Sequence, residues 1–286
     1  MGKEIEIIDA YNQLLYQKYD ENGLVCLSDN EYKYKGENVL GMNNPAVVMA
    51  SSVGVLTRLD QVCKKLNNKH FQKNPNLFQN ELIVATGDIK YRIGTLLLYQ
   101  PYIVSLIDSY SFHRGKKYYT YSQTRNDARF NRELPIAFEC LYKFWQRVGD
   151  YLIIFFPDIL FEKKGTTYFH DPFQYISKNH KELECSENYR WLKDFSSTIY
   201  PTFNKHRKFF VHHTGYDNQF FTKFLNANQD NSDAIVELDL ERKNWTPFLK
   251  EQLQHCNDGY LKLMHFLNEL EITKQEKGEF TYEIKK

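Results

Sequence analysis

Apolar residues recur every three or four positions along most of the chain. This spacing predicts helices, because such residues fall on one face of a helix with about 3.6 residues per turn. The segments that carry it are 5–19, 45–66, 81–112, 124–156, 184–197, 201–213, 218–226 and 244–272. We find no convincing apolar–polar alternation, which would be typical of strands, and no internal repeat. The predicted fold class is therefore all-α, a helical bundle or bundle-like array.

Polar stretches divide this pattern. Residues 21–44 are rich in Gly and Asn and predict a loop or a short hairpin, while 67–80 is the best linker candidate. A boundary near residue 75 would separate an N-terminal helical segment, 1–75, of unknown role from a helical domain, 76–286. The two could equally form one continuous domain, because 286 residues suffice for one large helical core.

Composition narrows the class of protein. The five cysteines lie tens of residues apart without metal-ligand spacing, which predicts free thiols in a reducing compartment and no metal site. We expect no cofactor, since the sequence has no phosphate-binding or dinucleotide-binding glycine motif. The start of the chain lacks the order of a secretion signal, and the apolar uncharged run 93–107 is too short to span a bilayer. The expected location is cytoplasmic, with no membrane partner.

Positive charge gathers in one segment, although the net charge of the chain is only +1. Residues 112–132 contain six Arg or Lys side chains and one acid, Asp127, with tyrosines between them. In an RNA-contacting loop, Tyr rings would stack on bases and cations would hold phosphates. The alternative is a plain basic surface loop. The candidate RNA-binding residues here are Arg114, Lys116, Lys117, Tyr118 and Arg125.

The segment 201–216 carries the candidate chemistry. Pro201 stands where a first-turn residue belongs and Gly215 where a helix would end, so a separate helix is predicted between them. At about 100° per residue, one side of this helix, expected to face the core, presents Phe203, His206, Phe209, Phe210 and His213. The polar side presents Asn204, Arg207, Lys208 and His212.

Arg207 and His212 on one polar side form a candidate catalytic pair. A neutral imidazole can take a proton from a ribose 2'-hydroxyl, and a guanidinium can hold the phosphate as charge develops. Asn204 would support the pair and Lys208 would add charge toward RNA. Three acids on the predicted helix 124–156 are candidate partners for an arginine, Arg207 among them, and the sequence does not choose between Glu133, Glu139 and Asp150.

The pattern Asn204-x-x-Arg207-Lys208-x-x-x-His212 resembles the signature of the HEPN superfamily (higher eukaryotes and prokaryotes nucleotide-binding), Arg followed four to six residues later by His on a helix. The resemblance implies a HEPN-like helical bundle over about the last two hundred residues, preceded by an additional N-terminal helical segment. It also implies a homodimer with a composite, metal-independent ribonuclease site. Cleavage would leave a 2',3'-cyclic phosphate and a 5'-hydroxyl. The implied role is a toxin or phage-defence effector, with RNA such as tRNA as substrate and an antitoxin as a candidate partner.

Two features of the motif leave alternatives open. His213 also satisfies the spacing and is the second choice for the catalytic histidine, and Thr214 stands where one toxin subfamily has a tyrosine. The alternative to catalysis is that Arg207 and Lys208 form a solvated helix face and His212 is a surface histidine. The chain would then be a non-catalytic helical module that binds RNA, a nucleotide or a protein.

Overall fold

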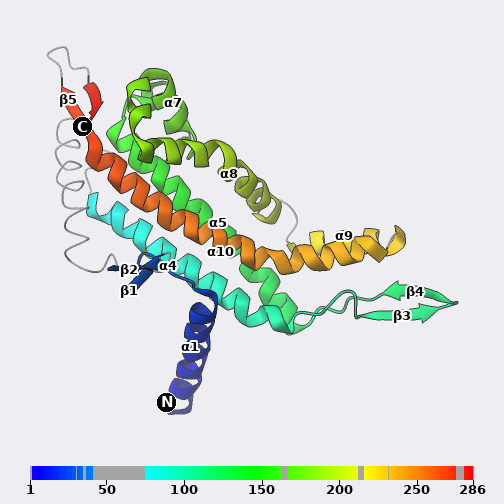
Figure 1. Ribbon diagram of the computed structural model, residues 1–286. Coiled ribbons are helices and arrows are strands. Elements are labelled where there is room, and N and C mark those ends of the chain that lie inside the picture. Colours follow the sequence, from blue (N-terminus) through cyan, green and yellow to red (C-terminus); the bar gives the residue numbers. More distant parts are fainter. Residues whose placement is uncertain are drawn as a thin grey trace. The chain divides into compact units, whose positions relative to one another are not determined.

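The computed structural model describes residues 2–29, 31–34, 37–40, 75–162, 166–211, 216–230, 232–274 and 280–285. This part of the chain is mostly helical, which confirms the predicted all-α class (Figure 1). The helices are α1 (Gly2–Asn22), α4 (Pro75–Tyr99), α5 (Arg125–Phe155), α6 (Ile159–Glu162), α7 (Asp171–Asn179), α8 (Glu187–Val211), α9 (Tyr216–Asp230) and α10 (Ser232–Glu269), with the 3-10 turns η2 (Gln100–Tyr102) and η3 (Lys181–Cys185). The strands are β1 (Glu31–Tyr34), β2 (Glu37–Leu40), β3 (Tyr110–His113), β4 (Lys116–Tyr119), β5 (Leu270–Lys274) and β6 (Phe280–Ile284).

The chain divides into two compact units, each assembled from separate stretches of sequence. Unit 1 comprises Met1–Leu24, Asp88–Cys140 and Lys205–Leu253. Unit 2 comprises Val25–Gly87, Leu141–Asn204 and Gln254–Lys286. The predicted boundary near residue 75 coincides with the first residue of α4, and the predicted helix 45–66 lies outside the described residues. That boundary stays a prediction.

Unit 1 has an aromatic core to which α5, α8 and α10 each contribute. The rings of Phe138 and Phe210 stack with their centroids 4.6 Å apart, and Trp245 meets both edge-on, at 5.8 Å and 4.9 Å. Phe138 and Phe210 are almost completely buried. Such edge-to-face and offset arrangements are those that aromatic quadrupoles favour. The high aromatic content of the sequence therefore supplies core volume here.

The first helix packs on α4 at a glycine. A Cβ at Gly94 would lie 3.1 Å from Cδ1 of Tyr19 and nearer still to Cε1, and 3.3 Å from Leu15. The absence of a side chain at Gly94 thus permits the close approach of α1. The predicted helix 81–112 contains both Gly94 and Pro101, and α4 continues through Gly94 but ends at Tyr99, directly before the turn that contains Pro101. Proline lacks the amide hydrogen that a longer helix would need there.

Unit 2 has its own aromatic core around Trp145. The indole stacks on Phe195 with ring centroids 4.0 Å apart, and Phe144 meets it edge-on at 5.2 Å. On α10, Gly259 leaves the space for this indole, because a Cβ there would lie 2.8 Å from Cζ3 of Trp145 and closer to Cη2. Since Trp145 is fully buried, it has no room to move away.

We therefore expect Gly259→Ala to lower the free energy of unfolding by about 1–3 kcal/mol, the usual cost of overpacking a dense core. Urea unfolding followed by circular dichroism measures this difference. Gln254→Ala, at an exposed position of the same helix, is the matched control and should stay close to the parent protein. Equal stability of Gly259→Ala and the parent protein would show that the indole is not confined as described.

Short antiparallel hairpins correct the expectation that the chain has no strands. β1 pairs with β2, as the alternative of a short hairpin within 21–44 allowed, and β3 pairs with β4. β5 pairs with β6, so the last long helix ends at Glu269 and not at 272. In this hairpin Tyr282 is buried and stacks on Phe156 with centroids 4.5 Å apart, which attaches the strands to unit 2.

Two further helix boundaries differ from the prediction. The segments 184–197 and 201–213 were expected to be separate helices, but α8 is continuous from Glu187 to Val211 with Pro201 inside it. The segment 157–180, which lies between two of the predicted helices, contains the short helices α6 and α7. A single proline costs one backbone hydrogen bond, and the packing of a long amphipathic face can outweigh that loss.

Candidate functional site

The end of α8 carries the residues that the sequence singled out. Its apolar side faces the core as predicted, because Phe203 and Phe210 are almost completely buried. The ring of His206 lies edge-on to Trp245 and to Phe248, with centroids 5.1 Å and 5.4 Å away. The aromatic residues of this side hold the helix in place, and with it the neighbouring polar side chains.

His206 is a core histidine by these contacts. Burial lowers its pKa, and the positive charge of Lys205 acts in the same direction. The carboxylate of Glu241 opposes this effect, and Lys223 adds to it. The imidazole is therefore neutral near pH 7 and packs as an aromatic ring, although it is adjacent to Arg207 in sequence.

Arg207 forms an ion pair with Glu139 of α5, within unit 1. Its Nε donates a hydrogen bond to Oε1 of Glu139 over 2.7 Å. The Arg207 side chain is only 11% exposed and that of Glu139 30% exposed. The Arg207 guanidinium therefore lies largely buried against α5, unlike in the alternative in which Arg207 and Lys208 form a solvated helix face. Charge-assisted hydrogen bonds of this kind are short and directional, so the pair fixes the orientation of the guanidinium plane.

The three acids of α5 have different partners. Glu133 accepts a hydrogen bond from Nη1 of Arg92 over 3.0 Å. Asp150 lies 3.2 Å from Nη1 of Arg147. Only Glu139 pairs with Arg207 among these three. The structure thus makes the choice that the sequence left open.

Asn204 precedes Arg207 by one turn of α8. Its residue is partly buried, and its Oδ1 is completely shielded from solvent without accepting a hydrogen bond within the described part of the chain. An amide oxygen shielded in this way without a partner costs about 1–3 kcal/mol. Lys208, in contrast, is exposed, as a residue that adds charge toward RNA must be.

The candidate catalytic histidine is not among the described residues. His212 and the second choice, His213, both fall in 212–215, directly after the last described residue of α8, Val211. The predicted helix end at Gly215 lies there too. The choice of His212 over His213 therefore stays a prediction from the helical projection.

The basic segment predicted as a loop is a hairpin in unit 1. β3 and β4 pair with Tyr110 opposite Tyr119 and with His113 opposite Lys116. Arg114 and Gly115 form the two-residue turn, with φ of 51° and 75°, the left-handed conformation that tight hairpin turns require. The hairpin follows α4 and precedes α5 in the ribbon (Figure 1). Arg114, Lys116, Lys117 and Tyr118 are all exposed on it, and Arg125 is exposed at the start of α5.

The hairpin is anchored at its root. Ser109 and Thr120 are joined by a backbone hydrogen bond of 2.8 Å and by their hydroxyls at 3.0 Å. Shortly before the hairpin in the chain, Leu106 donates its amide hydrogen to Oδ1 of Asp239 on α10 over 2.9 Å. The ring of Tyr121 packs against Phe220 of α9, with centroids 5.2 Å apart. These contacts join the root of the hairpin to the helices of unit 1.

A buried ion pair joins α5 to α10 close to this root. Asp127 of α5 and Arg242 of α10 are in direct contact, and their side chains are 0% and 1% exposed. Asp127 also accepts hydrogen bonds from the amides of Val104 (3.1 Å) and Thr124 (2.8 Å). Burial raises the pKa of Asp127, but the hydrogen bonds from Thr124 and Arg242 outweigh it, so the pKa lies below its usual value. Asp127, in the first turn of α5, thus binds the chain on both sides of the hairpin.

Sequence reasoning missed several of these residues. Tyr110 and Phe112 are exposed on β3, but they were assigned to a buried helix because their neighbours are apolar. Asp127 was counted only as the one acid of a basic segment. Its partner Arg242 lies 115 positions away in sequence, and no local pattern signals such a pair.

Within the described residues, no helix is both long and apolar enough to cross a membrane, and His, Cys, Asp and Glu side chains do not gather into groups of three that could hold a metal ion. Comparison with protein-family models, with curated proteins and with solved structures finds no match for this chain.

Proposed function

We propose that the protein is a metal-independent endoribonuclease of HEPN type, whose helices form a HEPN-like bundle and whose catalytic pair is Arg207 and His212. The observation that carries the proposal is the setting of Arg207. Its guanidinium is held by Glu139 of α5, and the sequence around it reads Asn204-x-x-Arg207-x-x-x-x-His212. An oriented guanidinium is what stabilisation of a phosphorane requires.

The reaction needs three events at one phosphodiester. The His212 imidazole takes the proton of the ribose 2'-hydroxyl, and the 2'-oxygen attacks the adjacent phosphorus. The bond from phosphorus to the 5'-oxygen breaks, and that oxygen takes a proton to leave as a 5'-hydroxyl. Arg207 binds the non-bridging oxygens, whose charge grows during the attack. The products are a 2',3'-cyclic phosphate and a 5'-hydroxyl.

The resemblance supports a homodimer in which two copies of the motif meet. A second imidazole from the other copy would supply the proton to the leaving oxygen. Light scattering after size exclusion would then give twice the mass of the chain. The substrate is RNA, with tRNA as the first class to examine, and the role that the resemblance supports is that of a toxin or phage-defence effector.

Glu139 is a positioning residue in this proposal. We expect Glu139→Ala to lower the cleavage rate at saturating RNA about tenfold, because the guanidinium loses its fixed orientation. Glu139→Gln keeps an oxygen that can accept the hydrogen bond and should recover part of the rate. The measurement is kcat and KM separately, for both variants.

Glu133→Ala is the matched control, since Glu133 lies on the same helix and pairs with a different arginine, Arg92. Both alanine variants remove one partly buried ion pair, so their stabilities should fall to a similar extent. Only Glu139→Ala should slow cleavage. Equal rates for Glu133→Ala and Glu139→Ala would assign Glu139 a purely structural role.

One observation favours a second candidate, a non-catalytic helical module. An arginine that is 11% exposed and paired with a carboxylate is also typical of a structural ion pair. This candidate predicts that the protein binds RNA, a nucleotide or a protein without turning RNA over.

Incubation of the protein with total RNA and with tRNA in EDTA tests the proposal. We expect discrete fragments whose 3' ends resist polyadenylation until the cyclic phosphate is removed, and whose 5' ends accept phosphate from a kinase. Cleavage that disappears with chelator would contradict the proposal, and binding without cleavage would favour the non-catalytic module.

A further inference from the structure

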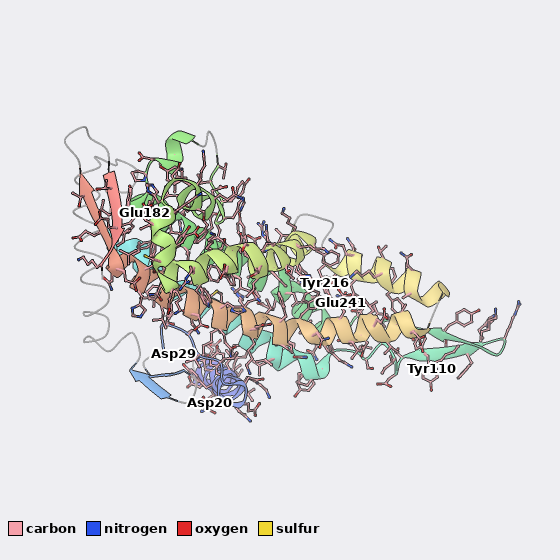
Figure 2. All side chains as sticks on the ribbon, turned by 45° about the horizontal axis from the view of Figure 1, so that its top comes forward. Asp20, Asp29, Tyr110, Glu182, Tyr216 and Glu241 are labelled. Atoms are coloured by element: carbon pink, nitrogen blue, oxygen red, sulfur yellow. The ribbon has the colours of Figure 1, made fainter. Side chains whose placement is uncertain are left out.

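The hairpin β3–β4 presents two different faces. Because residues paired across an antiparallel ladder lie on one face, Tyr110, Phe112, Lys117 and Tyr119 share what we call the aromatic face. The opposite face carries Ser111, His113, Lys116 and Tyr118. Figure 2 labels Tyr110 at the beginning of this hairpin. Both strands are exposed along almost their whole length, so neither face is covered by the described part of unit 1.

The aromatic face is preorganised. Tyr110 and Phe112 lie edge to face with centroids 5.6 Å apart. The ammonium of Lys117 lies 4.0 Å from the ring centroid of Tyr110 and 4.5 Å from that of Tyr119. A two-stranded hairpin is only marginally stable in water, and these cation–π and ring contacts fix its side chains without burying them. Phe112 remains 69% exposed and Tyr110 48% exposed.

The charge of the hairpin selects the class of partner. The strands and their turn contain Arg114, Lys116 and Lys117 and no acid. Flat exposed rings next to cations fit a chain of bases and phosphates, because rings stack on bases while cations hold the backbone. A lipid surface fits less well, since Lys117 lies among the rings and its charge would enter the apolar layer with them. An acidic peptide would use the cations but not the flat rings.

We propose that the aromatic face of β3–β4 binds single-stranded RNA by stacking bases on Phe112 and Tyr110, with Lys117 of that face and Arg114 of the turn on the phosphates. Bases in a duplex are stacked on each other and closed to these rings, so the substrate class is single-stranded RNA or an unpaired loop. That the bound nucleic acid is RNA rests on the proposed ribonuclease function.

Binding is measured with the full-length His212→Ala protein, so that no RNA is cut. The probe is a short fluorescein-labelled single-stranded RNA of mixed sequence, followed by anisotropy. We expect Phe112→Ala and Tyr110→Ala each to raise Kd about tenfold, the typical effect of losing one stacked base. Phe112→Trp keeps a stacking surface and should bind like the parent. Phe221→Ala, at an exposed position of α9 in the same unit, is the control and should leave Kd unchanged.

The salt dependence of RNA binding distinguishes the contribution of the aromatic rings from that of the cations. Arg114→Gln should lower the slope of log Kd against log salt by about 0.7, the value for one phosphate contact with a single strand, whereas Phe112→Ala should leave the slope unchanged. Duplex RNA of the same sequence should bind more weakly and be insensitive to Phe112→Ala.

Unchanged single-strand binding in both Phe112→Ala and Tyr110→Ala would overturn the proposal, as would the absence of any binding. Loss of binding to phosphatidylserine vesicles or to polyglutamate in these variants, with RNA binding intact, would overturn it in favour of a lipid or an acidic protein. If the parent protein cuts no RNA while these variants bind it more weakly, only the ribonuclease proposal fails. If the parent cuts RNA and the variants bind it normally, only the hairpin proposal fails.

Discussion

Replacement of His212 by alanine is expected to lower the rate of RNA cleavage in EDTA by at least about a hundredfold, the contribution that a positioned general base commonly makes. In the proposed reaction no other group takes the proton of the 2'-hydroxyl. RNA binding should change little, because the hairpin and Lys208 remain. The measurement is a single-turnover time course with an excess of enzyme, which separates chemistry from binding.

His213→Ala is the matched control for this prediction. For the predicted helix 201–213, the helical projection puts His213 on the side of Phe203 and Phe210, which are buried, and His212 on the side of Arg207. His213→Ala should therefore retain most of the cleavage rate. If His213→Ala abolishes cleavage and His212→Ala does not, the projection assigned the wrong histidine.

Asp127→Ala is expected to lower the free energy of unfolding by about 3–5 kcal/mol, the cost of leaving a buried charge without its partner. Arg242 would remain 1% exposed without its carboxylate, and the amides of Val104 and Thr124 would lose their acceptor. Urea unfolding at pH 7 measures the loss. Glu241→Ala removes the exposed ion pair between Glu241 of α10 and Lys223 of α9 and should cost less than about 1 kcal/mol.

The same carboxylate makes stability depend on pH. Because the pKa of Asp127 is lower in the folded protein than its usual value of 3.8, the stability it contributes is complete above that value. This contribution is lost as the pH falls through the lowered pKa. The difference in unfolding free energy between the parent protein and Asp127→Asn should therefore become smaller as the pH falls below about 5. A difference that stays constant down to the acid end would contradict the assigned pKa direction.

The helices were largely predictable because their amphipathic faces pack within the described units. Leu134, Ala137, Phe138 and Leu141 recur at helical spacing, and all four are buried along α5. The prediction failed at Pro201, where the packing of Phe203 and Phe210 continues a helix that the proline would locally interrupt. It failed again at 110–119, because a strand exposed on both faces has no apolar–polar alternation to detect.

The candidate site was predictable only as far as its residues share one helix. The spacing of Asn204, Arg207 and His212 is local, and the sequence displays it directly. The partner of Arg207 is not local, because Glu139 lies 68 positions earlier and becomes a neighbour only when α5 and α8 pack. Glu133 and Asp150 are also carboxylates on the same helix, so nothing in the sequence favours one of the three acids.

The proposed reaction requires a ribose 2'-hydroxyl next to the phosphate that is cut. An oligonucleotide with a single mapped cleavage site is made with either a ribose or a 2'-deoxyribose on the 5' side of the cut, and both are incubated with the parent protein in EDTA. We expect cleavage of the ribose substrate to a 2',3'-cyclic phosphate, identified by its mass, and no cleavage of the deoxyribose substrate. If both substrates are cut at similar rates, Arg207 and His212 do not act by promoting attack of the 2'-hydroxyl.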